Sequence, residues 1–162
     1  MITGTLTIKS GGHIRLQSTG VVTYASVTWA NGGVITDDGG SMPLINNNAT
    51  LTIPSSGILY AHTERTYNSV TVNGTISHWY NTTELVDPIS INLETAGSFS
   101  INAGGKIDVI GRGYQAGSGI QPGAIAARYQ GSGGGGYGGI GGNGNDGILG
   151  GEVYGDVVNP TH

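Results

Sequence analysis

A short unit of strand, corner and strand occurs five times in the first two thirds of this chain. Each unit opens with four residues that alternate hydroxyl and apolar side chains, a pattern that places the two kinds on opposite faces of a β-strand. The five opening segments are Thr5–Ile8, Ser26–Trp29, Thr50–Ile53, Ser69–Val72 and Ser98–Ile101. Repeats of roughly 20 residues predict stacked units, each too small to bury its own apolar face.

A corner rich in Gly and Asn follows each opening segment, and these residues tolerate the backbone of a sharp bend. A second strand then begins, in which we expect an inward-pointing isoleucine: Ile14, Ile35, Ile58, Ile76 and Ile107. The opening strands predict two interior columns, Leu6, Val27, Leu51, Val70 and Phe99 in one and Ile8, Trp29, Ile53, Val72 and Ile101 in the next. Two insertions, 36–48 and 78–88, are expected to protrude as loops.

These repeats predict an all-β fold, a short right-handed parallel β-helix of about five coils. A β-hairpin meander is the main alternative, but it does not require the same order of strand, corner and strand in every repeat. Helix signals are almost missing, because no window carries apolar residues at helical spacing.

The composition changes near residue 110, where glycine becomes dominant. The chain has 32 glycines in 162 residues, and most of them lie in the last third. We therefore divide the chain into β-helix coils at 1–110 and a largely irregular glycine-rich section at 111–162. Interspersed apolar and aromatic residues such as Tyr114, Ile125 and Tyr137 favour packed extended segments over a flexible linker. We expect the section to pack on the coils or continue them, within one structural domain.

Charge and cysteine content narrow the classes of function. Only 10% of the residues are charged, and the formal net charge is −4. A basic surface for nucleic acid is therefore not expected. No apolar stretch is long enough for a membrane span. The chain has no cysteine, which excludes disulfides and thiolate metal sites.

The second half contains segments that carry a family resemblance: GKIDVIGRGY at 105–114, the glycine tract at 131–144 and GGEVYGDVVNPTH at 150–162. Together they resemble a glycine-rich module of very large bacterial surface and secreted proteins, of the adhesin-like and pectin-lyase-like kind. In that family the module follows right-handed parallel β-helix coils. The resemblance covers Gly105–Pro160 by motif and the earlier coils by pattern. It implies an extracellular or cell-surface location and a fragment of a larger protein whose signal peptide lies outside this segment.

An aromatic and histidine group is the best candidate for a binding site. It comprises Tyr60, His62, His78, Trp79 and Tyr80, and the expected register brings Tyr60 beside His78, with Asp37 close to both. Aromatic faces stack on sugar rings, and neighbouring polar groups orient the hydroxyls. The alternative is that Trp79 and Tyr80 pack the following loop against the coils, and the sequence does not separate the two interpretations.

Other candidate chemistry is weaker. The outward Ser and Thr residues resemble the Thr-x-Thr surfaces of ice-binding proteins, but Thr is also an ordinary residue of solvent-facing strands. The carboxylates are scattered, and Asp37–Asp38 is the one adjacent pair. Since no basic cluster accompanies them, we do not expect an active polysaccharide lyase or hydrolase.

One segment fits a calcium-binding repeat. Residues 141–149 match the nonapeptide G-G-x-G-x-D-x-U-x, in which Asp146 would ligate Ca²⁺. A single copy in so glycine-rich a tract is better explained by chance. We therefore expect no cofactor, with Ca²⁺ at Asp146 as the alternative.

The sequence as a whole favours a non-enzymatic structural or adhesive module of a large bacterial surface protein or fibre. The expected partners are a polysaccharide or cell-surface glycan, and further β-helix sequence or another copy stacked end to end, because open coil ends are unpaired strand edges. The alternatives are a receptor-binding module of a phage tail adhesin, a fragment of a carbohydrate-active β-helix and, last, an ice-binding protein.

Overall fold

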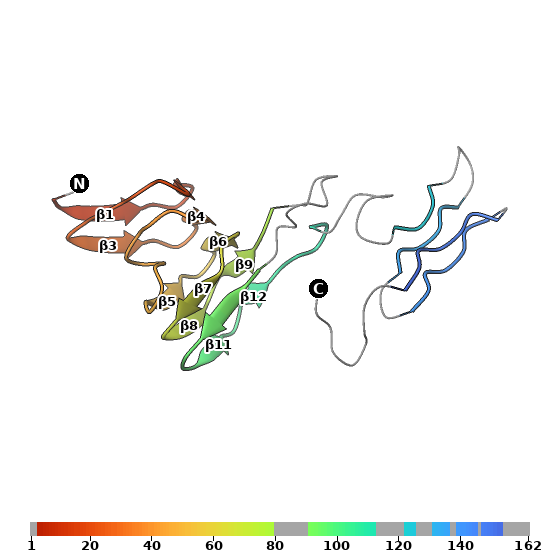
Figure 1. The fold of residues 1–162 in the computed structure, drawn as a ribbon. Coiled ribbons are helices and arrows are strands. Elements are labelled where there is room, and N and C mark those ends of the chain that lie inside the picture. Colours follow the sequence, from red (N-terminus) through yellow and green to blue (C-terminus); the bar gives the residue numbers. More distant parts are fainter. Residues whose placement is uncertain are drawn as a thin grey trace. The chain divides into compact units, whose positions relative to one another are not determined.

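The structure is a computed structural model that describes residues 3–79, 91–112, 122–125, 131–136, 139–145 and 147–153. The described residues form strands and irregular segments and no helix (Figure 1). The chain divides into two compact units, one of Met1–Trp79 with Ile89–Arg112 and one of Tyr80–Pro88 with Gly113–His162.

Every strand pairing in the first unit is parallel, and the sheets stack as a β-solenoid of about three turns. This confirms the prediction of a parallel, all-β solenoid. The strands are β1 (Thr5–Ile8), β2 (His13–Gln17), β3 (Ser26–Trp29), β4 (Val34–Asp38), β5 (Thr50–Ile53), β6 (Ile58–Ala61), β7 (Arg65–Tyr67), β8 (Ser69–Val72), β9 (Thr75–Ser77), β10 (Leu93–Thr95), β11 (Phe99–Ile101) and β12 (Lys106–Ile107).

The longest sheet has the strand order β12-β9-β6-β4-β2, and we call it the long sheet. In its register Ile35 lies beside Leu59, and Leu59 lies beside Ile76. The expectation that Ile58 points inward is therefore wrong by one residue. The corners 30–33 and 54–57 have the same length, so Ile58 lies beside Val34 on the outer face.

The opposite face is divided between two sheets, β1-β3 and β11-β8-β5. The expected columns therefore hold within each sheet, as in Leu51, Val70 and Phe99, but do not run unbroken from β3 to β5. The segment between β4 and β5 contributes Met42 and Ile45 to the core, where both side chains are fully buried. This insertion folds inward and does not protrude as the sequence analysis expected. The other insertion, 78–88, lies largely outside the described residues.

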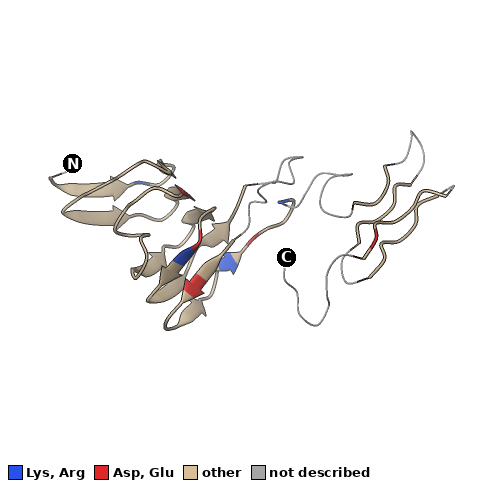
Figure 2. Ribbon diagram, in the orientation of Figure 1, with Lys and Arg blue, Asp and Glu red and all other residues tan. Residues whose placement is uncertain are grey.

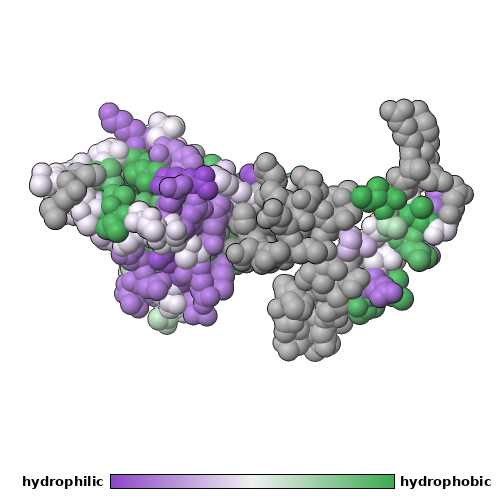
Figure 3. Space-filling view, turned by 45° about the horizontal axis from the view of Figure 1, so that its top comes forward, coloured by the Kyte–Doolittle hydropathy of each residue, from purple (hydrophilic) through white to green (hydrophobic). Residues whose placement is uncertain are grey.

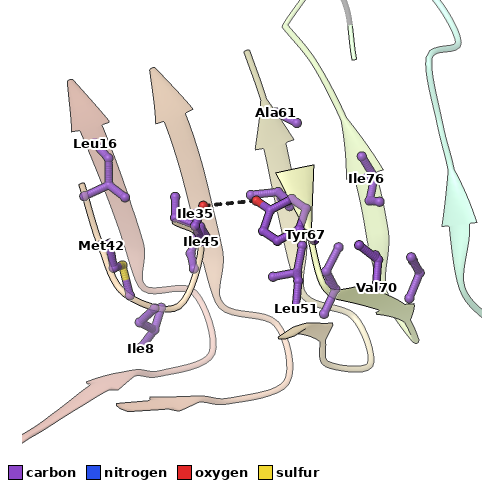
Figure 4. Close-up of a cluster of buried hydrophobic side chains, with 13 residues drawn as sticks. Ile8, Leu16, Ile35, Met42, Ile45, Leu51, Ala61, Tyr67, Val70 and Ile76 are labelled. Atoms are coloured by element: carbon purple, nitrogen blue, oxygen red, sulfur yellow. Dashed lines mark hydrogen bonds between the residues drawn. The ribbon is translucent and has the colours of Figure 1, made fainter. Parts of the chain in front are cut away.

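The core of the solenoid is a single cluster of buried apolar side chains (Figure 4). Tyr67 is the largest of them, and its hydroxyl donates to the carbonyl oxygen of Ile45 at 3.2 Å. The core thins toward the last coil, where Phe99 and Ile101 are 40% and 48% exposed although their neighbours Val70 and Val72 are fully buried. The inward side chains of this coil are thus only partly covered.

Main-chain contacts hold together the described segments of the second unit, 122–125, 131–136, 139–145 and 147–153. The amide of Gly134 donates to Gly142, that of Gly141 to Gly151, and that of Gly151 back to Gly134. The segments run so close together that a β-carbon at Gly144 would overlap the carbonyl oxygen of Gly131. Only glycine permits such an approach, as at the axis of collagen. These segments are packed chain and not a flexible linker.

Candidate functional site

A polar and aromatic group lies on the outer face of the long sheet. We call it the aromatic–ionic cluster; it consists of Arg15, Asp38, Tyr60, His62 and Trp79. The parallel register places these residues together: β2 and β4 bring Gln17 beside Asp38, and the amide of His62 continues the ladder by donating to the carbonyl of Asp37. Outward residues of successive coils thus become neighbours although they are far apart in the sequence.

Three aromatic rings of the cluster are in contact. The ring centres of Tyr60 and Trp79 are 6.2 Å apart, and those of His62 and Trp79 are 5.3 Å apart, both with edge-to-face geometry. The guanidinium carbon of Arg15 lies 4.4 Å from the centre of the Trp79 ring. These are the distances of attractive aromatic and cation–π contacts, so the side chains hold one another in place.

Hydrogen bonds indicate the tautomer of His62 and hold Asp38 as a carboxylate. The amide of Trp79 donates to Nε2 of His62 at 3.1 Å, so the ring proton resides on Nδ1, which donates to Asp38 at 2.6 Å. Asp38 also accepts a hydrogen bond from Arg15. Burial favours the neutral carboxyl, but the hydrogen bonds from Arg15 and His62 outweigh it and lower the pKa of Asp38. Asp38 is therefore an ionised carboxylate that orients both neighbours.

A pocket of about 370 Å³ opens beside the cluster, and we call it the outer pocket. Tyr60 belongs to both, because its ring also contacts Trp79. The pocket is lined by Ile58 and Tyr60 of β6, Thr75 and Ser77 of β9, and Lys106, Asp108, Ile110 and Arg112 at and after β12. Its size lies within the range of small-molecule sites.

Asp108 is the acidic residue of this pocket, and its hydrogen-bonding capacity is largely used. The ammonium of Lys106 lies 2.6 Å from its carboxylate, and the amide of Ile110 donates to the same group at 3.2 Å. The hydrogen bond from Lys106, and then that from Ile110, lower the pKa of Asp108. The hydroxyl of Ser77 donates to the main-chain oxygen of Asp108 at 2.6 Å and fixes this segment to β9.

Arg112 is the cation of the pocket that lacks a carboxylate partner. Its guanidinium carbon lies 5.9 Å from the centre of the Tyr60 ring, and it forms no ion pair within the described residues. Among the described residues, Figure 2 colours few charged positions on the ribbon. With the Lys106–Asp108 pair neutral, Arg112 leaves the described lining of the pocket with one positive charge in excess.

The structure brings together three of the residues proposed from the sequence, Tyr60, His62 and Trp79. His78 is buried, and its ring bonds to the carbonyl oxygen of Trp79; the neighbour of Tyr60 in the ladder is Ser77. The expected pairing of Tyr60 with His78 is therefore wrong by one residue. Tyr80 lies outside the described residues.

Asp37 lies inside the solenoid and not on the outer face. Its carboxylate is 2% exposed and accepts two hydrogen bonds from Arg65, each of 2.7 Å. The acidic residue of the cluster is its neighbour Asp38, which the sequence analysis missed together with Arg15 and Arg112. Strict alternation from the buried Ile35 would have placed Asp37 inward and Asp38 outward.

The structure bears on only one of the two weaker candidates, the outward Ser and Thr residues and the Ca²⁺ site. The hydroxyl file is divided between two sheets, since Thr5 bonds to Ser26 at 2.7 Å but β3 does not pair with β5. Asp146, the expected Ca²⁺ ligand, lies outside the described residues. Within the part of the chain that the structure describes, no group of three His, Asp or Glu side chains is arranged to hold a metal ion.

Comparisons with protein-family models, with curated proteins and with solved structures find no match. Among the described residues, no helix has the length and apolar character that a membrane crossing requires. The interpretation of the site therefore rests on its own geometry.

Proposed function

We propose that this chain is a non-enzymatic adhesive module of an extracellular bacterial protein, and that it binds a glycan at the outer pocket. The scaffold that we propose is a right-handed parallel β-helix of about five coils, one for each strand of the long sheet. Its stiff face would present the same groups in a constant arrangement, so that binding requires little ordering of the protein.

The observation that carries this proposal is the position of Tyr60 between the outer pocket and Trp79. A tyrosine ring beside a pocket offers a flat apolar surface, and the hydroxyls and cations around it offer hydrogen bonds. Glycans require this combination, because a sugar ring has an apolar face and a rim of hydroxyls. The contacts with Trp79 and His62 hold the ring in its position before any ligand arrives.

The protonation of the two carboxylates supports binding without catalysis. Glycoside hydrolysis needs one carboxyl with a raised pKa to act as a general acid. On this face both Asp38 and Asp108 have lowered pKa values, because each accepts hydrogen bonds from a cation. Such carboxylates serve as ion-pair partners and not as proton donors near neutral pH.

The proposal is tested by screening the purified chain on a glycan array and measuring the hits by isothermal titration calorimetry. Replacement of Tyr60 by alanine removes the ring beside the pocket and is expected to weaken binding about tenfold, the equivalent of roughly 1.4 kcal/mol. The matched control is Phe99→Ala, which removes an aromatic ring that is 40% exposed and belongs to the inward file of the last coil. Circular dichroism verifies that both variants fold.

Two results would contradict the proposal. One is the absence of any glycan ligand on a broad array, and the other is an equal loss of affinity in Tyr60→Ala and Phe99→Ala. Polysaccharide cleavage with the release of new reducing ends would also replace binding by catalysis as the function.

A phage tail adhesin is the second candidate, and the second unit favours it. Its glycine segments donate main-chain hydrogen bonds to one another, which makes a rigid support from a sequence with few side chains. Glycine-rich tracts packed into lattices suit the tip of such an adhesin. A stable trimer in sedimentation experiments would favour this candidate, and a monomer would argue against it.

A further inference from the structure

We infer that the outer pocket selects an acidic sugar, and that Arg112 binds the carboxylate of that sugar. This inference rests on the proposed glycan binding and adds the chemical class of the ligand. It follows from the balance of donors and acceptors that the described residues place around the pocket.

The donors of the pocket exceed its acceptors. Lys106 and Asp108 neutralise each other at 2.6 Å, and Asp108 accepts a second hydrogen bond from the amide of Ile110. The guanidinium of Arg112 has five N–H donors and, within the described residues, contacts only the face of Tyr60. Lys106 is 57% exposed and retains further N–H groups. A ligand in this pocket thus meets mainly unpaired donors and one net positive charge.

A carboxylate is the group that satisfies these donors best. The planar guanidinium matches a carboxylate with two parallel hydrogen bonds, and such charge-assisted bonds are about twice as strong as neutral ones. A sugar hydroxyl carries no charge and would leave the positive charge of the guanidinium without a partner. The geometry therefore favours an anionic unit over its neutral counterpart.

The remaining lining explains why the ligand is a sugar and not a small inorganic anion. The volume of about 370 Å³ exceeds what a bare phosphate or sulfate would fill. Tyr60 and Ile58 provide an apolar wall for a ring face, and the Thr75 hydroxyl forms no hydrogen bond within the described residues. An inorganic anion would use Arg112 but leave this wall and this hydroxyl without contacts.

The test compares acidic glycans with neutral counterparts by calorimetry. The probes are a glucuronic-acid-containing oligosaccharide with its glucose analogue, and sialyllactose with lactose. We expect at least one acidic probe to bind about tenfold or more tightly than its neutral partner, and a rise in salt to reduce this preference because exposed charges are screened. The arm that responds identifies the source of the carboxylate, either a uronic acid or a sialic acid.

Variants assign the effect to Arg112. Arg112→Gln is expected to weaken binding of the acidic probe about tenfold while leaving the neutral probe unchanged, and Arg112→Lys to retain part of the preference. The matched control Lys9→Gln removes the same charge from an exposed corner between β1 and β2, so a change in net charge alone would affect both variants equally.

The possible outcomes distinguish a failure of the acidic preference from a failure of the proposed glycan binding. Equal affinity for acidic and neutral probes would overturn the acidic preference and leave glycan binding intact. A preference that survives Arg112→Gln would overturn the assignment of this residue. If no glycan binds, the proposed function fails, and the inference fails with it.

Discussion

Asp37 and Arg65 form an ion pair inside the solenoid. Arg65 donates two hydrogen bonds to the carboxylate and a third to the carbonyl oxygen of Gly40 at 2.6 Å. The hydrogen bond with Asp37 raises the pKa of Arg65. The amide of Gly39 also donates to Asp37 at 3.1 Å, so the pair joins the end of β4 and the turn that follows it to β7. Removal of one partner would leave a buried charge without compensation.

We therefore expect Arg65→Ala to lower the free energy of unfolding by about 3–5 kcal/mol, the usual cost of breaking a buried pair from one side. Urea unfolding followed by circular dichroism measures the change. The matched control is Arg15→Ala, which breaks the ion pair with Asp38 on the surface, where Arg15 is 48% exposed. A change of about 1 kcal/mol or less is expected there. Similar losses in the two variants would contradict a structural role specific to the interior pair.

The pKa of Asp38 predicts a loss of stability in acid. Because hydrogen bonds from Arg15 and His62 lower this pKa in the folded protein, the contribution of Asp38 is complete above the ordinary value of 3.8. It disappears as the pH falls through the lowered folded value. Below pH 4 the wild-type protein should therefore lose more stability than Asp38→Asn, which has no carboxyl to protonate. Urea titrations at pH 6 and pH 3 measure the difference, and parallel losses would contradict the prediction.

At the scale of the strand, the register of β6 depends on which of two adjacent residues enters the core. Leu59 is buried between Ile35 and Ile76, whereas Ile58 faces the outer pocket. A shift of one residue would reverse these roles along the whole strand. The two side chains have the same size, so they provide a matched pair for a measurement.

Leu59→Ala should lower the free energy of unfolding by about 2–5 kcal/mol, because it removes buried apolar surface and leaves a cavity. Ile58→Ala should cost about 1 kcal/mol or less, as for most residues outside the core. Equilibrium urea unfolding of both variants is sufficient to compare them. The reverse order would show that Ile58 is the inward residue and that β6 lies in the register shifted by one residue.

The sequence was sufficient to find the strands with strong alternation. The segments expected at Thr5–Ile8, Ser26–Trp29, Thr50–Ile53 and Ser69–Val72 coincide with β1, β3, β5 and β8. The parallel pair of β7 and β10, which forms a separate two-stranded sheet, was not predicted, because these strands are three residues long and read RTY and LET, too short for a period of two to be visible. Short strands of this kind are stabilised by their neighbours in the stack and not by their own pattern.

The candidate site was predicted only in part, for a related reason. Tyr60, His62 and Trp79 attract notice as aromatic residues close in sequence, whereas Arg15 and Asp38 join them through pairing between coils. That pairing depends on corner length, which is four residues before β4 and β6 but two residues, Asn73 and Gly74, before β9. A single misjudged residue at a corner changes every lateral neighbour. The neighbours on the outer face could therefore be identified only from the structure.

At the scale of the molecule, each of the two units is stabilised internally by a different kind of interaction. The first has a core of apolar side chains, whereas the described segments of the second rely on main-chain contacts and expose several apolar residues, among them Ile125, Ile140 and Leu149. Figure 3 shows such hydrophobic residues on the surface of the second unit. A unit of this kind should be sensitive to glycine substitution wherever two main chains touch, and insensitive elsewhere.

Gly144 and Gly142 allow this to be tested two residues apart. A β-carbon at Gly144 would overlap the carbonyl oxygen of Gly131, whereas one at Gly142 would have nothing within 4 Å, and neither residue has a positive φ. Gly144→Ala should therefore force the segments apart, and Gly142→Ala should not. Hydrogen exchange at the amides of Gly134, Gly141 and Gly151 reports the contacts directly, because each donates to a neighbouring segment. We expect exchange at these amides to accelerate about tenfold or more in Gly144→Ala alone.

The same experiment includes its own reference in the first unit. Amides of the long sheet, such as that of Ile58, which donates to Gly33 at 3.0 Å, belong to the other compact unit and should keep their wild-type protection in both variants. If Gly142→Ala accelerates exchange as much as Gly144→Ala, close main-chain approach is not what holds the second unit together. If neither substitution has an effect, the glycine segments do not pack against one another in solution, and the rigid support invoked for the phage tail adhesin is lost.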